Sequence, residues 1–188
     1  MLKIDFSPQQ LSLLRSDHAG ELGAVNIYKG ILCYARDPEI VAFANCHLEV
    51  ESKHLASVEN ILVREKRSIL SPLWVVAGRL LGLMAVFGGK NFLFSTIASV
   101  EEFVVEHYKQ QLSFFSGTVQ ELLKDMMVDE NMHREDAAHR SSRRHMLWDI
   151  LVKKGCGLAV SASSKCRVNS PRPKSVQRLR GCKVKTHV

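Results

Sequence analysis

Residues 51–54 read Glu-Ser-Lys-His and residues 130–133 read Glu-Asn-Met-His, so the pattern Glu-x-x-His occurs twice in the 188-residue chain. Side chains three positions apart lie on the same side of an α-helix, so each pair can bind one metal ion. Random placement of the eight His and twelve Glu of this chain would give roughly 0.5 matches to the pattern. The two matches alone are therefore weak evidence for a site.

A glutamate lies about one helical hairpin before each pair, and this repeat is the stronger signal. Glu21 precedes Glu51 by 30 residues, and Glu101 precedes Glu130 by 29 residues. The spacing predicts two helical hairpins, each with one Glu on its first helix and Glu-x-x-His on its second. Carboxylate-bridged di-iron four-helix bundles take this set of ligands from their four helices. The sequence therefore predicts an all-α four-helix bundle with the metal ligands Glu21, Glu51, His54, Glu101, Glu130 and His133.

Apolar residues recur at intervals of three and four along each predicted helix, and the candidate ligands lie on these stripes. An isolated ionised carboxylate on an inward stripe is costly, so each one needs a partner. The alternative is a set of buried Glu/His hydrogen bonds without any metal. That alternative is favoured for a single pair and disfavoured for six residues on four stripes.

Four Glu and two His form an oxygen-rich ligand set. Such a set suits Fe(II), Fe(III) or Mn(II) and matches structural zinc poorly, because structural zinc favours Cys and His. Carboxylates can bridge two ions, so we expect O2 activation, ferroxidation or peroxide chemistry. His18 and His107 could orient ligating carboxylates or be ordinary structural histidines. Tyr28 and Tyr108 are predicted to be core residues.

The stretch between Ser68 and Val100 separates the two predicted hairpins and carries only two charged residues, Arg79 and Lys90. A transmembrane helix needs about 18 to 20 consecutive apolar residues, and these two charges divide the stretch into shorter pieces. We therefore predict a long apolar crossover helix that lies on the bundle or in one leaflet of a membrane. Plain burial in the core is an equal alternative.

The positive charge of the chain is concentrated near its C-terminus. Ten of the 26 Lys and Arg lie from Lys153 onward, where there is no acid, so the preceding part has sixteen bases against 19 acids. The net charge of +7 thus belongs to the tail, and we expect no nucleic-acid binding by the bundle.

The predicted domains are a bundle at residues 1–160 and a basic disordered tail at residues 161–188. After Trp148 the helical pattern is expected to continue for only one or two turns, to the Gly155-Cys-Gly157 segment. Beyond it Ser, Pro, Lys and Arg predominate without apolar periodicity. A solvated extension is favoured over a segment that binds anionic lipid.

Five cysteines without a CxxC pair indicate neither a disulfide framework nor a zinc site, so a reducing compartment is expected. The first residues, MLKIDFSPQQ, have neither the apolar core of a signal peptide nor the Arg/Ser-rich composition of a transit peptide. Both observations favour a cytoplasmic origin.

Longer motifs resemble the demethoxyubiquinone hydroxylases of ubiquinone biosynthesis over residues 10–163. The most specific is His18-Ala-Gly-Glu21, because ferritins, rubrerythrins and ribonucleotide reductase subunits share Glu-x-x-His. The basic sequence after Cys166 departs from the family pattern. The remaining motifs are Leu73-Trp74-x-x-Ala77-Gly78, Val100-Glu101-Glu102 before His107-Tyr108, and Asp129-Glu130-x-x-His133.

The resemblance implies a ferritin-like di-iron monooxygenase that hydroxylates the ring of a polyprenylated methoxybenzoquinol, using O2 and electrons from NADH. It implies that the six candidate ligands bind two iron ions (Fe2+/Fe3+), with Glu101 rather than Glu102 as the ligand in the Val100-Glu101-Glu102 motif. It also implies peripheral attachment, through the apolar crossover at residues 73–94, to the membrane that holds the quinone. That membrane would be a bacterial inner membrane at its cytoplasmic face, or the mitochondrial inner membrane on its matrix side. A homo-oligomer stays open.

Two other functions stay open. A ferroxidase or iron-storage protein would use the same six ligands, whereas a metal-free, membrane-associated helical scaffold would need none of them. The low-charge crossover suits a lipid substrate better than a storage cage, whose outer faces are polar.

Overall fold

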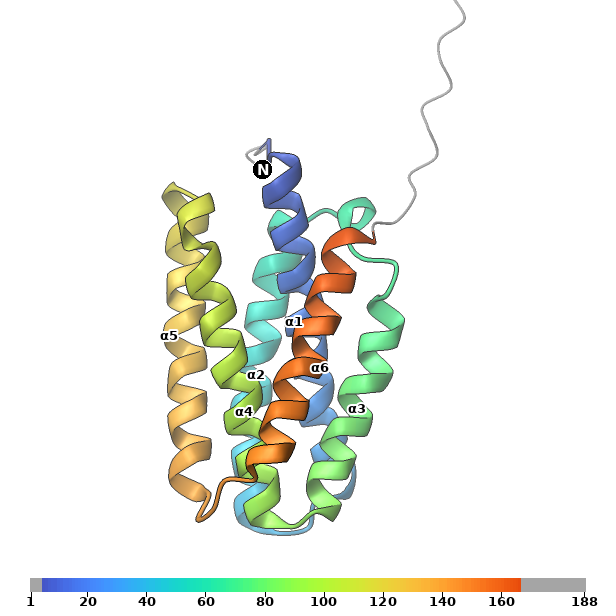
Figure 1. Cartoon of the computed structure of the whole chain (residues 1–188), viewed down its shortest axis with the longest axis vertical. Coiled ribbons are helices and arrows are strands. Elements are labelled where there is room, and N and C mark those ends of the chain that lie inside the picture. Colours follow the sequence, from blue (N-terminus) through green and yellow to red (C-terminus); the bar gives the residue numbers. More distant parts are fainter. Residues whose placement is uncertain (1–4, 167–188) are drawn as a thin grey trace, which may run out of the picture.

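The computed structural model describes residues 5–166, which form six α-helices, two short 3-10 helices and no strand (Figure 1). The predicted all-α, ferritin-like class is thereby confirmed. The two hairpins of the bundle are α1 with α2 and α4 with α5. The α-helices are α1 Pro8–Tyr34, α2 Pro38–Ile61, α3 Ser71–Phe87, α4 Lys90–Gln111, α5 Gly117–Arg140 and α6 Met146–Lys165.

The first hairpin begins and turns where local sequence chemistry directs it. Ser7 and Gln10 form a reciprocal capping box at the start of α1, with Pro8 at the first helical position. Asp37 caps α2 by accepting a hydrogen bond from the Glu39 backbone N–H at 2.8 Å. Only residues 35–37 separate the two helices, so α1 and α2 are antiparallel neighbours.

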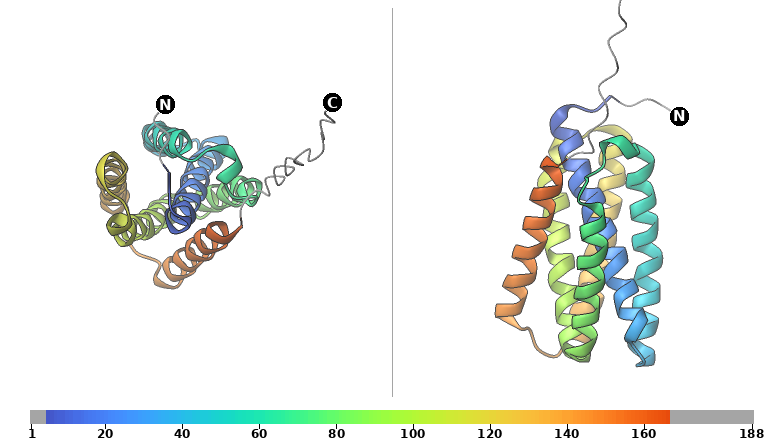
Figure 2. Two further views of the ribbon diagram at one scale, coloured as in Figure 1. Left: turned by 90° about the horizontal axis from the view of Figure 1, so that it is seen from above. Right: turned by 90° about the vertical axis from the view of Figure 1, so that its right-hand side faces the viewer.

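The apolar crossover is helix α3, and it packs along α1 (Figure 2). Small residues make this approach close, because a Cβ on Gly82 would overlap the carbonyl oxygen of Ile27. The opposite face of α3 is exposed, with Phe87 75% accessible. The crossover therefore lies on the bundle and is not a core helix. Within residues 5–166 no helix combines the length and the apolar run needed to cross a membrane.

Helix α6 is longer than predicted. It runs through Gly155 and Gly157 to Lys165, past the expected end of the bundle at residue 160, and lies along α1 and α4 (Figures 1 and 2). Tertiary contacts explain the error. The Trp74 indole N–H donates to Ser163 Oγ at 2.6 Å, and the Arg15 guanidinium donates to the Ser164 carbonyl at 2.7 Å. Such contacts outweigh the low helix propensity of the two glycines. Residues 167–188 of the predicted tail lie outside the described residues.

Two apolar clusters fill the bundle, and the candidate ligands lie between them along each of the four hairpin helices α1, α2, α4 and α5. On α1, Glu21 stands between Leu14 of one cluster and Ile27 of the other. On α4, Glu101 stands between Ile97 and Tyr108 in the same way. The polar layer is therefore closed at both ends by packed side chains, which keep water away from it.

We expect Gly82→Ala to destabilise the protein by about 1–3 kcal/mol, because the added methyl group must push α3 away from α1. Chemical unfolding at equilibrium measures the change. Gly155→Ala is the matched control, since no neighbouring atom lies within 4 Å of a Cβ at that position in α6. Replacing Gly by Ala in an open helical position should stabilise by about 0.5–1 kcal/mol. Equal effects of the two substitutions would contradict the close α1–α3 contact.

Candidate metal centre

All six predicted ligands are buried and converge from α1, α2, α4 and α5, and none is more than 7% exposed. Their donor atoms form two overlapping groups whose members lie within 4.8 Å of one another. Glu51 and Glu130 belong to both groups, as carboxylates that bridge two ions would. One group is Glu21, Glu51, His54 and Glu130, and the other is Glu51, Glu101, Glu130 and His133. The ligand role of these residues stays a prediction.

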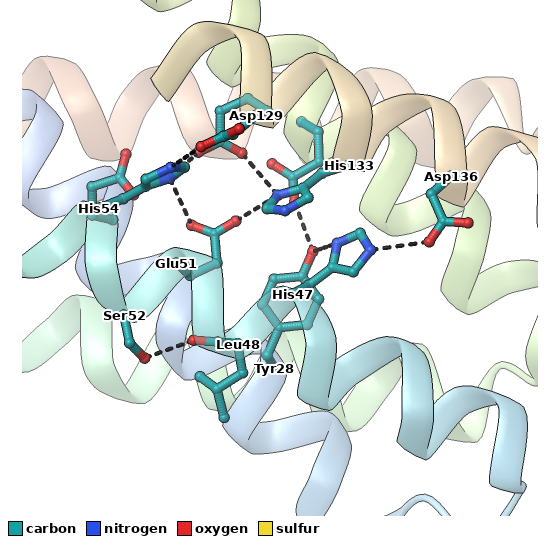
Figure 3. A network of polar contacts seen from close by, with 12 residues as sticks. Tyr28, His47, Leu48, Glu51, Ser52, His54, Asp129, His133 and Asp136 are labelled. Atoms are coloured by element: carbon teal, nitrogen blue, oxygen red, sulfur yellow. Dashed lines mark hydrogen bonds and ion pairs between the residues drawn. The ribbon is translucent and has the colours of Figure 1, made fainter. Parts of the chain in front are cut away.

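Both imidazoles present Nδ1 to the carboxylates (Figure 3). His54 Nδ1 lies 2.9 Å from Glu130 Oε1, and His133 Nδ1 lies 3.0 Å from Glu51 Oε1. The Nε2 atom of His54 faces outward and lies 3.1 Å from Asp129 Oδ2. A carboxylate in this position fixes the tautomer that leaves Nδ1 free to bind a metal ion.

Burial and crowding raise the pKa values of some carboxylates in the cluster, whereas the histidines lower the pKa of another. Burial, followed by the negative charges of Glu130 and Glu51, raises the pKa of Glu21 well above its usual range. Burial and the same two charges raise the pKa of Glu101. Although burial opposes it, hydrogen bonds from His133 and His54 lower the pKa of Glu130 to about 2. The protein alone therefore supplies too little positive charge for four ionised carboxylates.

The hydrogen bonding of the carboxylates fits a metal centre. Seven buried side-chain N or O atoms have no hydrogen-bond partner within the described part of the chain. Four of these seven are the Oε2 atoms of Glu21, Glu51, Glu101 and Glu130. A buried carboxylate oxygen without a partner is costly, and a cation removes that cost. Each candidate Glu thus keeps one oxygen that a metal ion could use.

Tyr28 and Tyr108 are buried, as predicted, but they also contact the candidate ligands. Tyr28 donates a hydrogen bond to Glu101 Oε1 at 2.9 Å, and Tyr108 donates to Glu21 Oε1. The contacts cross between the hairpins, because Tyr28 shares α1 with Glu21 and Tyr108 shares α4 with Glu101. A sequence signal for this role exists, since each tyrosine follows its own helix's Glu by seven residues on the same face.

His18 and His107, for which an orienting role and an ordinary structural role were equal alternatives, do not contact the candidate ligands through the hydrogen bonds that they form. His18 Nε2 lies 3.2 Å from Glu59 Oε1, and His107 Nε2 lies 3.1 Å from Asp17 Oδ1. A residue that sequence reasoning missed, His47, lies beside a candidate ligand instead. The His47 ring contacts the His133 ring, with centroids 4.1 Å apart and planes tilted by 32°, and its Nε2 lies 3.1 Å from Asp136 Oδ2 (Figure 3).

An apolar cavity of about 620 Å³ adjoins the carboxylate cluster. Residues of α1, α3, α4 and α6 line it, including both tryptophans of the chain, Trp74 and Trp148. Glu21 and Tyr108 form the part of its wall that belongs to the candidate metal centre. The volume lies in the range of small-molecule binding sites. One wall comes from α6, a helix whose length the sequence pattern underestimated.

The family model described as "Ubiquinone biosynthesis protein COQ7" matches residues 9–163. The chain is 31% identical over 175 residues to the 3-demethoxyubiquinol 3-hydroxylase of Rhodospirillum rubrum, which covers 86% of this chain and 81% of the relative. It is 28% identical over 165 residues to the "NADPH-dependent 3-demethoxyubiquinone 3-hydroxylase, mitochondrial" of Caenorhabditis elegans. This match covers 81% of the chain and 88% of the relative. The Homo sapiens protein of the same name is 26% identical over 165 residues, a match that covers 81% of the chain and 76% of the relative.

The metal-free protein should lose stability as the pH rises from 5 to 8. Because its folded pKa is raised, Glu21 contributes full stability below its unfolded pKa of about 4.5 and loses it as the pH rises through the folded value. Glu101 acts in the same direction. Glu21→Gln should reduce this loss by about 1.4 kcal/mol for each pKa unit removed. Unfolding in the presence of a chelator measures it.

Glu49→Gln is the control for this measurement, because Glu49 is an exposed α2 residue paired with Lys53. It should leave the slope between pH 5 and 8 unchanged, since exposed pairs contribute little. If Glu21→Gln and Glu49→Gln showed the same pH dependence as the wild-type protein, the crowding described for the cluster would be wrong.

Proposed function

The chain belongs to the ubiquinone biosynthesis protein COQ7 family, and we propose that it is a di-iron monooxygenase acting on a quinol. The reaction proposed is hydroxylation, with O2, of the ring of a polyprenylated methoxybenzoquinol, the demethoxyubiquinol of ubiquinone biosynthesis. One observation carries the proposal most directly: the apolar cavity reaches the buried carboxylates at Glu21. An apolar ring with polar substituents fits such a cavity, and the names of the relatives agree with it.

Two iron ions are the proposed cofactor, held by Glu21, Glu51, His54, Glu101, Glu130 and His133. When bound, they supply electrons for the reduction of O2. One oxygen of each glutamate has no hydrogen-bond partner, which supports a bound cation, and the oxygen-rich donor set favours iron over zinc. A nicotinamide cofactor, NADH or NADPH, is the proposed electron source, and the names of the nematode and human relatives specify NADPH.

The chain's own residues would hold and shield the reacting groups. Tyr108 and Tyr28 each occupy one oxygen of Glu21 or Glu101 by donating a hydrogen bond, which leaves the other oxygen for an ion. Trp74, Leu81 and Phe103 line the cavity and would exclude water from the ring. A water-poor site strengthens the hold of the carboxylates on the cations and limits side reactions.

We propose that the protein attaches peripherally to the membrane that dissolves the quinol. This membrane is the bacterial inner membrane at its cytoplasmic face, or the mitochondrial inner membrane on its matrix side. Support comes from α3, whose exposed apolar residues recur at intervals of three and four and therefore form one stripe. These residues are Leu73, Val76, Leu80, Met84 and Phe87. The prenyl tail would stay in the lipid while the ring enters the cavity.

Mass spectrometry of quinones tests the activity in cells that lack the protein and express variants of it. Glu130→Ala should abolish hydroxylation, so the demethoxy quinone accumulates, because this residue belongs to both ligand groups. Glu135→Ala, an exposed α5 residue with a side chain 57% accessible, is the control and should behave as wild type. Unchanged hydroxylation in Glu130→Ala would refute the proposal.

Two measurements on the purified protein separate the rival functions. Iron-loaded cages on size-exclusion chromatography would favour storage. A protein that binds no iron after anaerobic purification and reconstitution would favour a metal-free scaffold.

Co-sedimentation with liposomes tests the attachment. The double variant Leu80→Ser/Phe87→Ser should bind vesicles at least about tenfold more weakly, because burial of each large apolar side chain contributes about 1.5–3 kcal/mol. Met132→Ser on α5 is the matched control, since Met132 is 54% exposed and lies away from α3. Equal binding by both variants would exclude the α3 stripe as the attachment surface.

A further inference from the structure

Two glycines in the middle of α1, Gly20 and Gly23, are explained neither by packing nor by backbone conformation. A Cβ on either one would have no atom within 4 Å outside the local helix backbone, and neither residue has a positive φ. On α3, by contrast, a Cβ on Gly78 or Gly82 would overlap a carbonyl oxygen of α1. Glycine inside a helix weakens it relative to alanine. The two α1 glycines therefore weaken their helix and leave space that the described protein atoms do not fill.

This space belongs to the apolar cavity, beside the candidate metal centre. Gly20 and Gly23 both line the cavity, and both are half-buried. Spacings of four and three residues place them on the same face of α1 as Ser16, which also lines the cavity. Glu21 follows Gly20 directly, lines the same cavity and has one buried oxygen without a hydrogen-bond partner. The space over the two glycines therefore adjoins a proposed metal ligand.

Large side chains from the other helices line the same cavity. They include Trp74, Leu81, Phe103 and Trp148. Because α1 contacts both α3 and α6, side chains of these helices can cover one face of a ring whose other face lies on α1. Glycine is the residue that lets a backbone approach a ligand closely.

The dimensions of a methyl group make the two glycines decisive for such a ring. Ring carbons in van der Waals contact with a glycine Cα lie about 3.5–4 Å from it. A Cβ would extend about 1.5 Å from the Cα into that gap and overlap the ring. Alanine at either position would therefore displace a ring that lies flat on this part of α1.

We propose that Gly20 and Gly23 form the floor of a ring-binding subsite, on which the methoxybenzoquinol ring lies flat beside Glu21. Their missing side chains are the specificity determinant, because they admit a planar ring at the one level of α1 that adjoins the candidate metal centre. The subsite rests on the proposed function and deepens it, since it takes the quinol ring as the occupant of the cavity.

Gly20→Ala and Gly23→Ala should change stability and binding in opposite directions. Each should raise the melting temperature by about 1–4 °C, because alanine favours an open helical position. Each should weaken binding of the quinol by about 5- to 100-fold, because the added methyl group occupies the place of the ring. A merely structural role of the glycines predicts no loss of binding.

Binding is measured anaerobically on the full-length protein loaded with Mn(II), which does not exchange electrons with the ring. The probe is a decyl-substituted methoxybenzoquinol. Trp74 and Trp148 are the only tryptophans and both line the cavity, so quenching of tryptophan fluorescence reports binding.

Gly157→Ala is the matched control, and it should bind the probe as the wild-type protein does. Gly157 lies on α6 and is not among the described residues that line the cavity. A Cβ there would lie 3.6 Å from Phe103 Cε2, an ordinary contact distance, so this variant should also be at least as stable as the wild-type protein.

Wild-type affinity in both α1 variants would overturn the proposal, since the ring would then lie elsewhere. So would a lower melting temperature of either variant, because the space over the glycines would then not be open. Failure of the wild-type protein to bind the quinol would overturn it as well. The measurement needs no turnover. If the wild-type protein binds the quinol and the α1 variants bind it weakly, but no hydroxylation occurs, the oxygenase is refuted and the subsite stands.

Discussion

The repulsion among four buried carboxylates is the constraint around which this bundle is built. Each of the four helices of the two hairpins contributes one glutamate to a layer without access to bulk water. Two histidines offset only part of the negative charge. Burial and the remaining negative charge raise the pKa values of Glu21 and Glu101, and one oxygen of every glutamate has no hydrogen-bond partner. A pair of cations, as proposed for this site, would resolve this imbalance, because buried charges without partners are costly.

The helices around this layer hold it rigidly. Apolar clusters close it at both ends, so the carboxylates cannot relax toward solvent. The crosswise hydrogen bonds of Tyr28 and Tyr108 connect the two hairpins directly at the ligands. His47 on α2 contacts the imidazole ring of His133, and Asp129 on α5 contacts the imidazole ring of His54. Packing and hydrogen bonds thus fix the positions of the candidate ligands without an ion, as a preorganised site requires.

The two added helices distinguish this bundle from one that would only store metal. Helices α3 and α6 cover one side of the bundle and form the outer walls of the cavity that reaches Glu21. Their outward faces remain apolar, with Leu147 87% exposed on α6 and Phe87 75% exposed on α3. Apolar surfaces on both sides of a helix are consistent with a ligand that is itself lipid-soluble. The proposed route of the ring from the lipid phase to the candidate metal centre runs between these two helices.

The sequence by itself determined the helical class, the two hairpins and the convergence of six residues. These features follow from local periodicity, since spacings of three, four and seven residues place side chains on one face of a helix wherever that helix packs. Only the tertiary structure decided the length of α6, the cavity and the crosswise hydrogen bonds of the two tyrosines. Each of these depends on contacts between helices, as when Trp74 of α3 bonds Ser163 and extends α6 beyond its glycines. Periodicity within one helix carries no information about which partner faces it, so these features required the assembled bundle.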